Sequence, residues 1–190
     1  MPTMLPAFAD PVHDAQQTFR ALLDAMAQPG RCCSLPELTP PPGLTSACAA
    51  ACLTLLDNEV TLWLEDSLQN SRPWLQFHTG CPLAPSPQAD FALTRGEAID
   101  LSAFNIGTAE YPEASATLLL QVTSLTGGPT VALRGPGILD QRAIAPQVPA
   151  GFWTQWRENA GHYPMGVDVF LLGETQVMGL PRTAEVILTP

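Results

Sequence analysis

Two apolar segments, at residues 117–125 and 130–134, are separated by a turn that contains two glycines and a proline. Leu118, Leu120 and Val122 share one face of a period-two strand, while the opposite face is more mixed in polarity. Glycine accepts positive φ and proline cannot donate to a ladder, so this turn favours chain reversal. The pattern predicts a long antiparallel hairpin at the centre of a sheet, with the first face in the core.

The N-terminal part of the chain has the spacing of helices. Asp10 is a favourable N-cap and Pro11 a favourable first helical residue, so a helix is predicted from there to about residue 26. Its apolar positions at helical spacing are Val12, Ala15, Phe19, Leu22, Leu23 and Met26. A second helix, rich in small residues, is predicted from Thr45 or Ser46 to about residue 56. Residues 1–9 are predicted to form a loose arm.

Shorter elements follow, with strands and helices alternating first and paired strands dominating later. We therefore expect an α/β or α+β fold in a single domain, residues 1–190, with one mixed, mostly central sheet flanked by helices. Strands are predicted at 60–64, 90–94, 166–172, 176–180 and 186–188, and helices at 71–77 and after Pro149; residues 107–113 are predicted to be loop, 96–105 helix or turn, and 139–145 strand or loop.

Length and charge narrow the class of protein. At 190 residues the chain is long enough to bury a core, and no apolar run is long enough to cross a bilayer, so we expect a soluble, cytoplasmic protein without membrane partners. The net charge of −10 repels polyphosphate backbones, which argues against nucleic-acid binding.

The sequence contains no lysine: all eight basic residues are arginines. This excludes a Walker A lysine, a kinase-type strand lysine and a lysine Schiff base to pyridoxal phosphate or to a carbonyl substrate. We expect no bound cofactor.

The five cysteines do not resemble a secreted disulfide framework, because their number is odd and Cys32 and Cys33 are adjacent. Cys48 and Cys52 have the first half of the spacing that holds an iron-sulfur cluster in radical enzymes, but Leu55 occupies the third position. Reduced thiols packed as small apolar side chains are favoured over a cluster or a zinc site. No metal is expected.

A glycine motif at residues 135–137 follows a predicted strand, as a dinucleotide-binding fingerprint would. Asp140 occupies the third glycine position, and no clear helix begins there. A tight turn is the favoured interpretation.

Candidate chemistry is sparse, and no catalytic residue stands out. The candidates for acid–base or anion contact are His162, Arg142 and Arg182, all close to predicted turns. Arg182 with Asp168 could border a cleft near the acidic loop at 110–113, or simply form a bridged, solvated rim.

A possible interaction surface lies on the helix after Pro149. Trp153 and Trp156 are three residues apart and share a helix face, next to Phe152 and Arg157. Tryptophan and arginine are common at interface hot spots, so these four are interface candidates, with core packing as the alternative.

Many short motifs occur together in an order that resembles the PhnH family of bacterial carbon-phosphorus lyase subunits. They lie at 10–26, 29–30, 112–113, 116–122, 124–125, 127–128, GPGI at 135–138, IAP at 144–146, PMGVD at 164–168 and LPRT at 180–183. The resemblance covers the chain from the first helix to the last strands.

The resemblance implies a fold similar to the large domain of pyridoxal-phosphate-dependent transferases, without the cofactor. It also implies a homodimer in isolation and a core complex with PhnG, PhnI and PhnJ that handles ribose-linked phosphonates made from ATP. Radical cleavage of the carbon-phosphorus bond would belong to PhnJ. No settled catalytic residue transfers from the family.

Two functions are consistent with these expectations. The first is a required, non-catalytic subunit that acts through protein–protein assembly. The alternative is an enzyme subunit that contributes a cleft for phosphate or ribose-phosphonate at a subunit interface, with Arg142 or Arg182 as the anion contact and His162 as acid or base.

Overall fold

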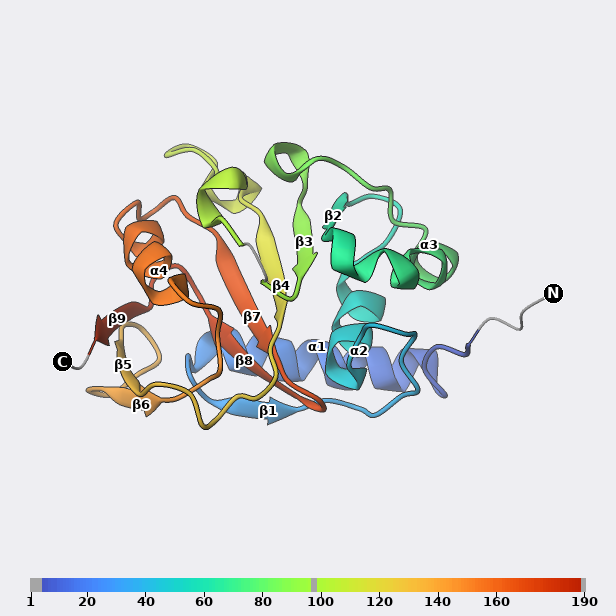
Figure 1. The fold of residues 1–190 in the computed structure, drawn as a ribbon, viewed down its shortest axis with the longest axis horizontal. Coiled ribbons are helices and arrows are strands. Elements are labelled where there is room, and N and C mark those ends of the chain that lie inside the picture. Colours follow the sequence, from blue (N-terminus) through green and yellow to red (C-terminus); the bar gives the residue numbers. More distant parts are fainter. Residues whose placement is uncertain (1–4, 97–98, 189–190) are drawn as a thin grey trace.

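The structure is a computed structural model that describes residues 5–96 and 99–188. A six-stranded mixed sheet forms its centre, and a small three-stranded antiparallel sheet lies beside it (Figure 1). In spatial order the large sheet contains β1 (Cys32–Ser34), β8 (Gln176–Leu180), β7 (Asp168–Leu172), β4 (Thr117–Gln121), β3 (Phe91–Thr94) and β2 (Leu62–Leu64). The small sheet contains β6 (Arg142–Ile144), β5 (Val131–Arg134) and β9 (Glu185–Leu188).

Strands β2, β3, β4 and β7 run parallel, while β8 and β1 are antiparallel to their neighbours. The carboxyl ends of the four parallel strands therefore lie along one edge of the sheet. A mixed α/β architecture with helices on both sides of a central sheet is thus confirmed. The expectation of one sheet is wrong, since β5, β6 and β9 form a second.

Helices cover both faces of the large sheet (Figure 1). Helices α1 (Pro11–Ala27), α2 (Ser46–Leu55) and α3 (Arg72–Thr79) pack on one face, and α4 (Phe152–Ala160) packs on the other together with the small sheet. Short 3-10 turns connect these elements at η1 (Asp66–Ser71), η2 (Ser86–Gln88), η3 (Leu101–Ala103) and η4 (Pro112–Ala114).

Because it is covered on both sides, β4 buries leucines on both faces. Leu119 faces the core under α1, α2 and α3, whereas Leu118 and Leu120 face the core under α4, and all three are 0% exposed. This is the pattern of a central parallel strand. The first face is core, as expected, while the second face is mixed in polarity because Thr117 and Gln121 flank the buried Leu119.

The predicted hairpin between residues 117–125 and 130–134 is also wrong. β4 pairs on one edge with β3 and on the other with β7, so it has no free edge for β5. β5 instead pairs with β6 and β9 in the small sheet. The glycines of the connecting turn serve a different contact, since Gly128 donates to the carbonyl of Ala145 at 2.7 Å.

The first helix is confirmed, with its predicted cap. The Asp10 side chain accepts a hydrogen bond from the His13 amide at 3.1 Å, which satisfies one of the free donors at the helix start. The helix lies against β8 because Gly179 has no side chain; a Cβ there would be 2.5 Å from the Ala25 carbonyl oxygen. Small residues on both elements thus set the distance between this helix and the sheet.

The second helix is confirmed as α2, with Thr45 as its N-cap, and residues 46–52 are all buried. The third begins at Arg72 and ends at Gly80, whose φ of +70° suits the left-handed C-cap position. The predicted strands correspond to β2, β3, β7, β8 and β9. Residues 139–145, predicted to be either strand or loop, contain β6.

The prediction of a loose N-terminal arm does not hold for residues 5–9. The Trp74 indole N–H donates to the Leu5 carbonyl at 3.1 Å, and a ring nitrogen of His78 lies 3.0 Å from the same oxygen. Phe8 is only 9% exposed. The segment is therefore held against α3 by hydrogen bonds and apolar contact, while residues 1–4 lie outside the described part of the chain.

Two further segments resolve as turns. Residues 135–138 form a tight turn in which the Ile138 amide donates to the Gly135 carbonyl at 3.2 Å, and the chain continues into β6 rather than into a helix. The segment 96–105 contains the short turn η3, with residues 97–98 outside the described range.

The helix predicted after Pro149 is α4. It begins at Phe152, three residues after Pro149, with Gly151 at its N-cap.

Candidate functional site

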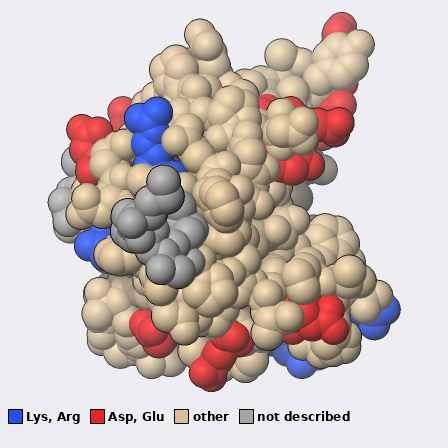
Figure 2. Space-filling view, turned by 90° about the vertical axis from the view of Figure 1, so that its right-hand side faces the viewer, with Lys and Arg blue, Asp and Glu red and all other residues tan. Residues whose placement is uncertain are grey.

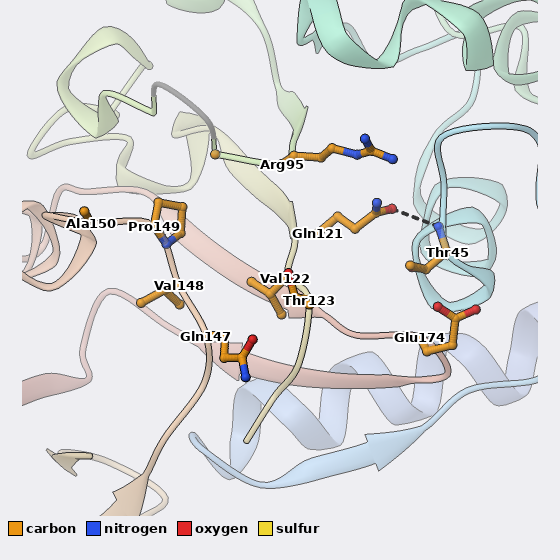
Figure 3. Close-up of a pocket in the computed structure, with 11 residues that line it drawn as sticks. Thr45, Arg95, Gln121, Val122, Thr123, Gln147, Val148, Pro149, Ala150 and Glu174 are labelled. Carbon is orange, nitrogen blue, oxygen red and sulfur yellow. Dashed lines mark hydrogen bonds between the residues drawn. The ribbon is translucent and has the colours of Figure 1, made fainter. Parts of the chain in front are cut away.

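A cleft of about 780 Å³ lies at the carboxyl edge of the large sheet. Its walls come from the residues that directly follow β3, β4 and β7, together with the start of α2 and the segment 147–150. The cleft is lined by Thr45, Arg95, Gly96, Gln121, Val122, Thr123, Gln147, Val148, Pro149, Ala150 and Glu174 (Figure 3). Ligands of open α/β sheets bind outside the carboxyl ends of the strands, so this is the candidate site.

Gln121, the last residue of β4, links β4 to the segment that leads into α2 and so forms one wall of the cleft. Its side-chain oxygen accepts from the Thr45 amide at 2.8 Å, and its side-chain nitrogen donates to the Gly43 carbonyl at 3.1 Å. Thr45 in turn caps α2 by accepting from the Cys48 amide at 3.3 Å. The start of α2 is thereby fixed beside the end of β4.

Arg95 projects into the cleft from the turn after β3. Figure 3 shows its side chain extending toward the α2 wall, and one of its terminal nitrogens donates to the Gly43 carbonyl at 2.7 Å. The residue is exposed. In the described part of the lining, its guanidinium is positively charged and Glu174 is negatively charged.

The turn that carries Arg95 is held by the partly buried carboxylate of Glu65. One carboxylate oxygen of Glu65 accepts from the Thr94 hydroxyl, from the Arg95 amide at 2.6 Å and from the Gly96 amide at 3.2 Å. Burial alone would raise the pKa of this carboxyl, but the hydrogen bonds from Thr94, Arg95, Gly96 and Ser67 outweigh it and lower the pKa below its usual 4.5. Glu65 is therefore ionised at neutral pH.

The opposite wall is the extended segment 147–150. The Gln147 amide donates to the Ser124 carbonyl at 2.9 Å, which fixes this segment to the chain leaving β4. Val148 and Pro149 give the wall an apolar surface. The two walls approach closely at one point, where a Cβ on Gly96 would lie 2.4 Å from Pro149.

The lining favours binding over covalent chemistry. Among the described residues it presents one guanidinium, one carboxylate, two amides and two hydroxyls, next to the apolar side chains of Val122, Val148 and Pro149. No cysteine or histidine is among the lining residues within 5–96 and 99–188. These groups can hold a polar ligand by hydrogen bonds and orient it.

The sequence-based candidates lie elsewhere, and Arg182 is the most constrained of them. Its guanidinium contacts Asp168 at 2.5 Å, the Pro112 carbonyl at 2.7 Å and the Ser115 hydroxyl at 2.5 Å. The backbone amide of Arg182 also donates to Asp168 at 2.7 Å. The arginine thus joins the ends of β7 and β8 to the turn before β4, and its donors are engaged within the chain.

Arg142 also has a structural partner. One of its terminal nitrogens donates to the carbonyls of Gln28 and Pro29, at 3.0 and 2.7 Å. These carbonyls follow the end of α1, where a positive charge is favourable. Arg142 therefore fastens the small sheet to the end of α1.

His162 is exposed at the end of α4 and borders a separate hollow of about 190 Å³ with Asp100, Glu158 and Asn159. Arg182 borders a different hollow, with Tyr163 and Glu185. The structure does not bring His162, Arg142 and Arg182 together around one of the described hollows.

The aromatic cluster of α4 divides between core and surface. Phe152 and Trp156 are 0% exposed, and the Trp156 indole donates to the Ala184 carbonyl at 2.9 Å. Both therefore lie in the interior of this chain, in the core that α4 shares with the two sheets. Trp153 is partly buried, and its indole N–H has no hydrogen-bond partner. Arg157 is exposed.

The cysteines of α2 are core residues, as favoured from the sequence. Cys48 and Cys52 are 0% exposed, and all five cysteines are unpaired. Within the described residues, no group of His, Cys, Asp or Glu side chains has the arrangement of a metal site.

A surface that the sequence did not predict lies on α1. Val12, Phe19 and Leu23 belong to the apolar positions that predicted this helix, yet they are 82%, 52% and 57% exposed. They fall on one side of the helix at positions i, i+7 and i+11. The sheet covers only the neighbouring side, with Leu22 and Ala25, so the apolar face of α1 is wider than the core that it meets. We call these three residues the α1 stripe.

Charged groups on the face seen in Figure 2 are scattered around wide uncharged areas rather than gathered in a basic patch. None of the described helices is both long enough and apolar enough to cross a membrane.

The cleft residues were missed because their common location depends on strand direction. Arg95 and Glu174 follow predicted strands and Gln121 lies in one, but the strand at 117–125 was assigned an antiparallel partner. Had β3, β4 and β7 been assigned as parallel, Arg95, Gln121 and Glu174 would have been placed at one edge.

Comparison with known proteins gives consistent matches over nearly the full chain. The family model described as "Bacterial phosphonate metabolism protein (PhnH)" matches residues 6–187. The chain is 39% identical over 186 residues to "Alpha-D-ribose 1-methylphosphonate 5-triphosphate synthase subunit PhnH" of Rhizobium meliloti (strain 1021), covering 94% of this chain and 93% of that protein. It is 31% identical over 174 residues to "Putative C-P lyase subunit protein HtxG" of Stutzerimonas stutzeri, covering 91% and 86%. The residues matched by the family model include α1 and the cleft lining.

Proposed function

Because the chain belongs to the PhnH family of bacterial phosphonate metabolism proteins, we propose that it is a required, non-catalytic subunit of a multi-subunit enzyme that acts on phosphonates. The family membership confirms the resemblance found in the sequence and carries the proposal. The names of the two relatives support it, since one is a subunit of a ribose methylphosphonate triphosphate synthase and the other a C-P lyase subunit.

The proposed mode of action is assembly. The α1 stripe supports it, because three large apolar side chains on one side of a helix are typical of a surface that another polypeptide covers. We propose PhnG, PhnI and PhnJ as partners, and a homodimer when the chain is alone. Of the interface candidates on α4, Trp153 is partly exposed and Arg157 is exposed, so both could contact a partner.

We also propose a cytoplasmic location and kinship with the pyridoxal-phosphate transferase fold. The five unpaired thiols support a reducing compartment. A central, largely parallel sheet between helices is compatible with that kinship, and the absence of lysine fits a fold that does not anchor the cofactor.

The experiment for the assembly role is co-expression with the proposed partners, followed by native mass measurement. The proposal expects the chain to co-purify at a fixed stoichiometry, and a strain that lacks it to lose growth on methylphosphonate. A chain that stays alone in the presence of all partners, or that turns over a phosphonate by itself, would rule out this role.

A second function is favoured by one observation, the 780 Å³ cleft at the carboxyl edge of the sheet. In this alternative the subunit contributes a binding cleft to the complex. Arg95 takes the place of the anion contact proposed from the sequence, because it lies on the lining of this cleft and Arg142 and Arg182 do not. The test is whether Arg95→Gln abolishes growth on methylphosphonate while the complex still assembles.

A further inference from the structure

We propose that the loop at residues 105–116 is a contact surface separate from the α1 stripe, and that it inserts Tyr111 into a basic surface of a partner polypeptide. This inference rests on the assembly role proposed above, to which it adds a surface and a partner chemistry. The observations that carry it are the closed backbone of the loop, the exposure of residues 110–113, which we call the loop tip, and the charges on that tip.

The loop lies between η3 and β4, at the amino end of β4 and away from the cleft (Figure 1). Its two ends are joined by a hydrogen bond from the Ala116 amide to the Asn105 carbonyl at 2.7 Å. The Asn105 side chain also donates to the Ala114 carbonyl at 2.7 Å. A compact surface loop with joined ends is an Ω-loop, a type that is frequently functional.

The backbone beneath Tyr111 is held on several sides. The Thr108 amide donates to the Tyr111 carbonyl at 3.2 Å, and the Tyr111 amide donates to the Thr108 hydroxyl at 3.0 Å. Gly107 has a φ of +75°, and a Cβ there would lie 2.8 Å from the Pro112 carbonyl oxygen. Arg182 donates to the same carbonyl from outside the loop at 2.7 Å. The loop is therefore ordered within the free chain, which lowers the entropic cost of binding.

The loop tip presents an aromatic ring that this chain leaves uncovered. Tyr111 is 61% exposed, and tyrosine is enriched at interface hot spots because its rigid ring supplies a large contact area. Tyr163 is 65% exposed and borders a hollow of about 310 Å³ together with Arg182. Since Arg182 also holds the Pro112 carbonyl, the tip and this hollow belong to one surface.

The charges on the loop tip favour a basic partner. Glu110 and Glu113 flank Tyr111, and both are exposed. Arg182 does not neutralise them, because its guanidinium is paired with Asp168 at 2.5 Å. Two copies of this chain that met through their tips would bring like charges together, whereas arginine or lysine side chains would complement them. The inferred occupant is therefore a different polypeptide, with basic residues around a pocket for the ring.

The test is capture of PhnG, PhnI and PhnJ after co-expression, with the affinity tag on this chain. Tyr111→Ala should reduce the captured partners by at least about tenfold, while Tyr111→Phe should retain most of them because the ring is kept. Phe77→Ala is the matched control, since it removes a ring that is 68% exposed on α3, and it should leave capture unchanged. Capture by Tyr111→Ala at the level of the unaltered chain would overturn the proposal.

The partner's charge is tested by Glu110→Gln and Glu113→Gln together. This double variant should capture severalfold less partner at low salt, and the difference should disappear at about 0.5 M salt because exposed charges are then screened. Glu37→Gln with Glu59→Gln removes the same charge from exposed sites outside the loop and should have no effect. If the tip variant captures as much as the unaltered chain at low salt, the partner surface is not basic.

Gly107→Ala tests the ordered backbone without altering the tip. The added Cβ would meet the Pro112 carbonyl, so the loop must shift and capture should fall severalfold. Gly151→Ala is its control, because Gly151 also has a positive φ, of +80°, but a Cβ there has no other atom within 4 Å among the described residues. An equal response to the two substitutions would contradict the role of the closed loop.

A photo-crosslinking residue in place of Tyr111 identifies the occupant within the assembled complex. The expected product joins this chain to an arginine- or lysine-rich peptide of a partner. A product that joins two copies of this chain, or no product in an intact complex, would refute the proposed contact. Failure of the unaltered chain to capture any partner would refute the assembly role itself, whereas normal assembly of Tyr111→Ala would refute the loop contact alone.

Discussion

The guanidinium of Arg182 lies 2.5 Å from the carboxylate of Asp168, and the two side chains are only 13% and 25% exposed. The pair connects the start of β7 to the end of β8, and Arg182 continues the network to the Pro112 carbonyl. Arg182 was an anion-contact candidate from the sequence. In the structure it links the β7–β8 hairpin to the turn before β4.

Arg182→Ala should destabilise the fold by about 2–3 kcal/mol, because it leaves a partly buried carboxylate and a carbonyl without their donor. Arg182→Lys should restore only part of this, since an ammonium cannot reproduce the planar fork. Denaturant unfolding measures both. Arg20→Ala, at an exposed position on α1, should stay within about 0.5 kcal/mol. A stable Arg182→Ala protein that no longer supports growth on methylphosphonate would instead favour a direct role in the site.

The two tryptophans of α4 should respond differently to loss of the indole. Trp156→Phe removes the donor to the Ala184 carbonyl in a fully buried position and should cost roughly 2–3 kcal/mol. Trp153→Phe removes an N–H that has no partner, so it should change stability by less than about 1 kcal/mol in either direction. Thermal and denaturant unfolding compare the pair, and a larger loss at Trp153 would contradict the structure.

Glu65 should make stability depend on acid pH. Its folded pKa is lowered, so its contribution is complete above the unfolded value near 4.5 and is lost as the pH falls through the lower, folded pKa. Glu65→Gln should therefore destabilise the protein by roughly 1 kcal/mol at pH 7, and the difference from the unaltered chain should shrink below pH 4.5. A constant difference across the acid range would show that the carboxylate charge does not matter.

Thiol reactivity should follow burial. Cys32 is exposed and should react first with an alkylating reagent, followed by Cys33, although burial raises the pKa of both thiols. Burial raises the pKa of Cys81 to about 11, so only about 0.1% of it is thiolate at pH 8. Peptide mass analysis after timed labelling gives the order, and full labelling in denaturant is the control. Early labelling of Cys81 in the native protein would contradict the packing around it.

The α1 stripe should matter for assembly and not for folding. Phe19→Gln and Leu23→Gln keep good helix formers at exposed positions and should change stability by less than about 0.5 kcal/mol. Together they should weaken capture by the partner subunits by at least about tenfold, if the stripe is covered in the complex. Leu139→Gln, at a site that is 99% exposed and lies outside α1, is the matched control. Unchanged native mass for the stripe variants would move the interface elsewhere.

Local patterns in the sequence determined most of the elements. Asp10 and Pro11 begin α1, Thr45 begins α2 and Gly80 ends α3, because caps and turns depend on a few adjacent residues. The same holds for the buried strand β7 and its hairpin with β8. The missing lysine and the family motifs also needed no coordinates.

Tertiary structure alone decided which elements meet. Whether β4 pairs with β5 or with β3 and β7 depends on contacts between distant segments, and local alternation cannot report the direction of a neighbouring strand. That one choice places Arg95, Gln121 and Glu174 around a cleft. Packing likewise decided that Trp156 is core while Phe19 is surface, because helical periodicity identifies an apolar face but not how much of that face the sheet will cover.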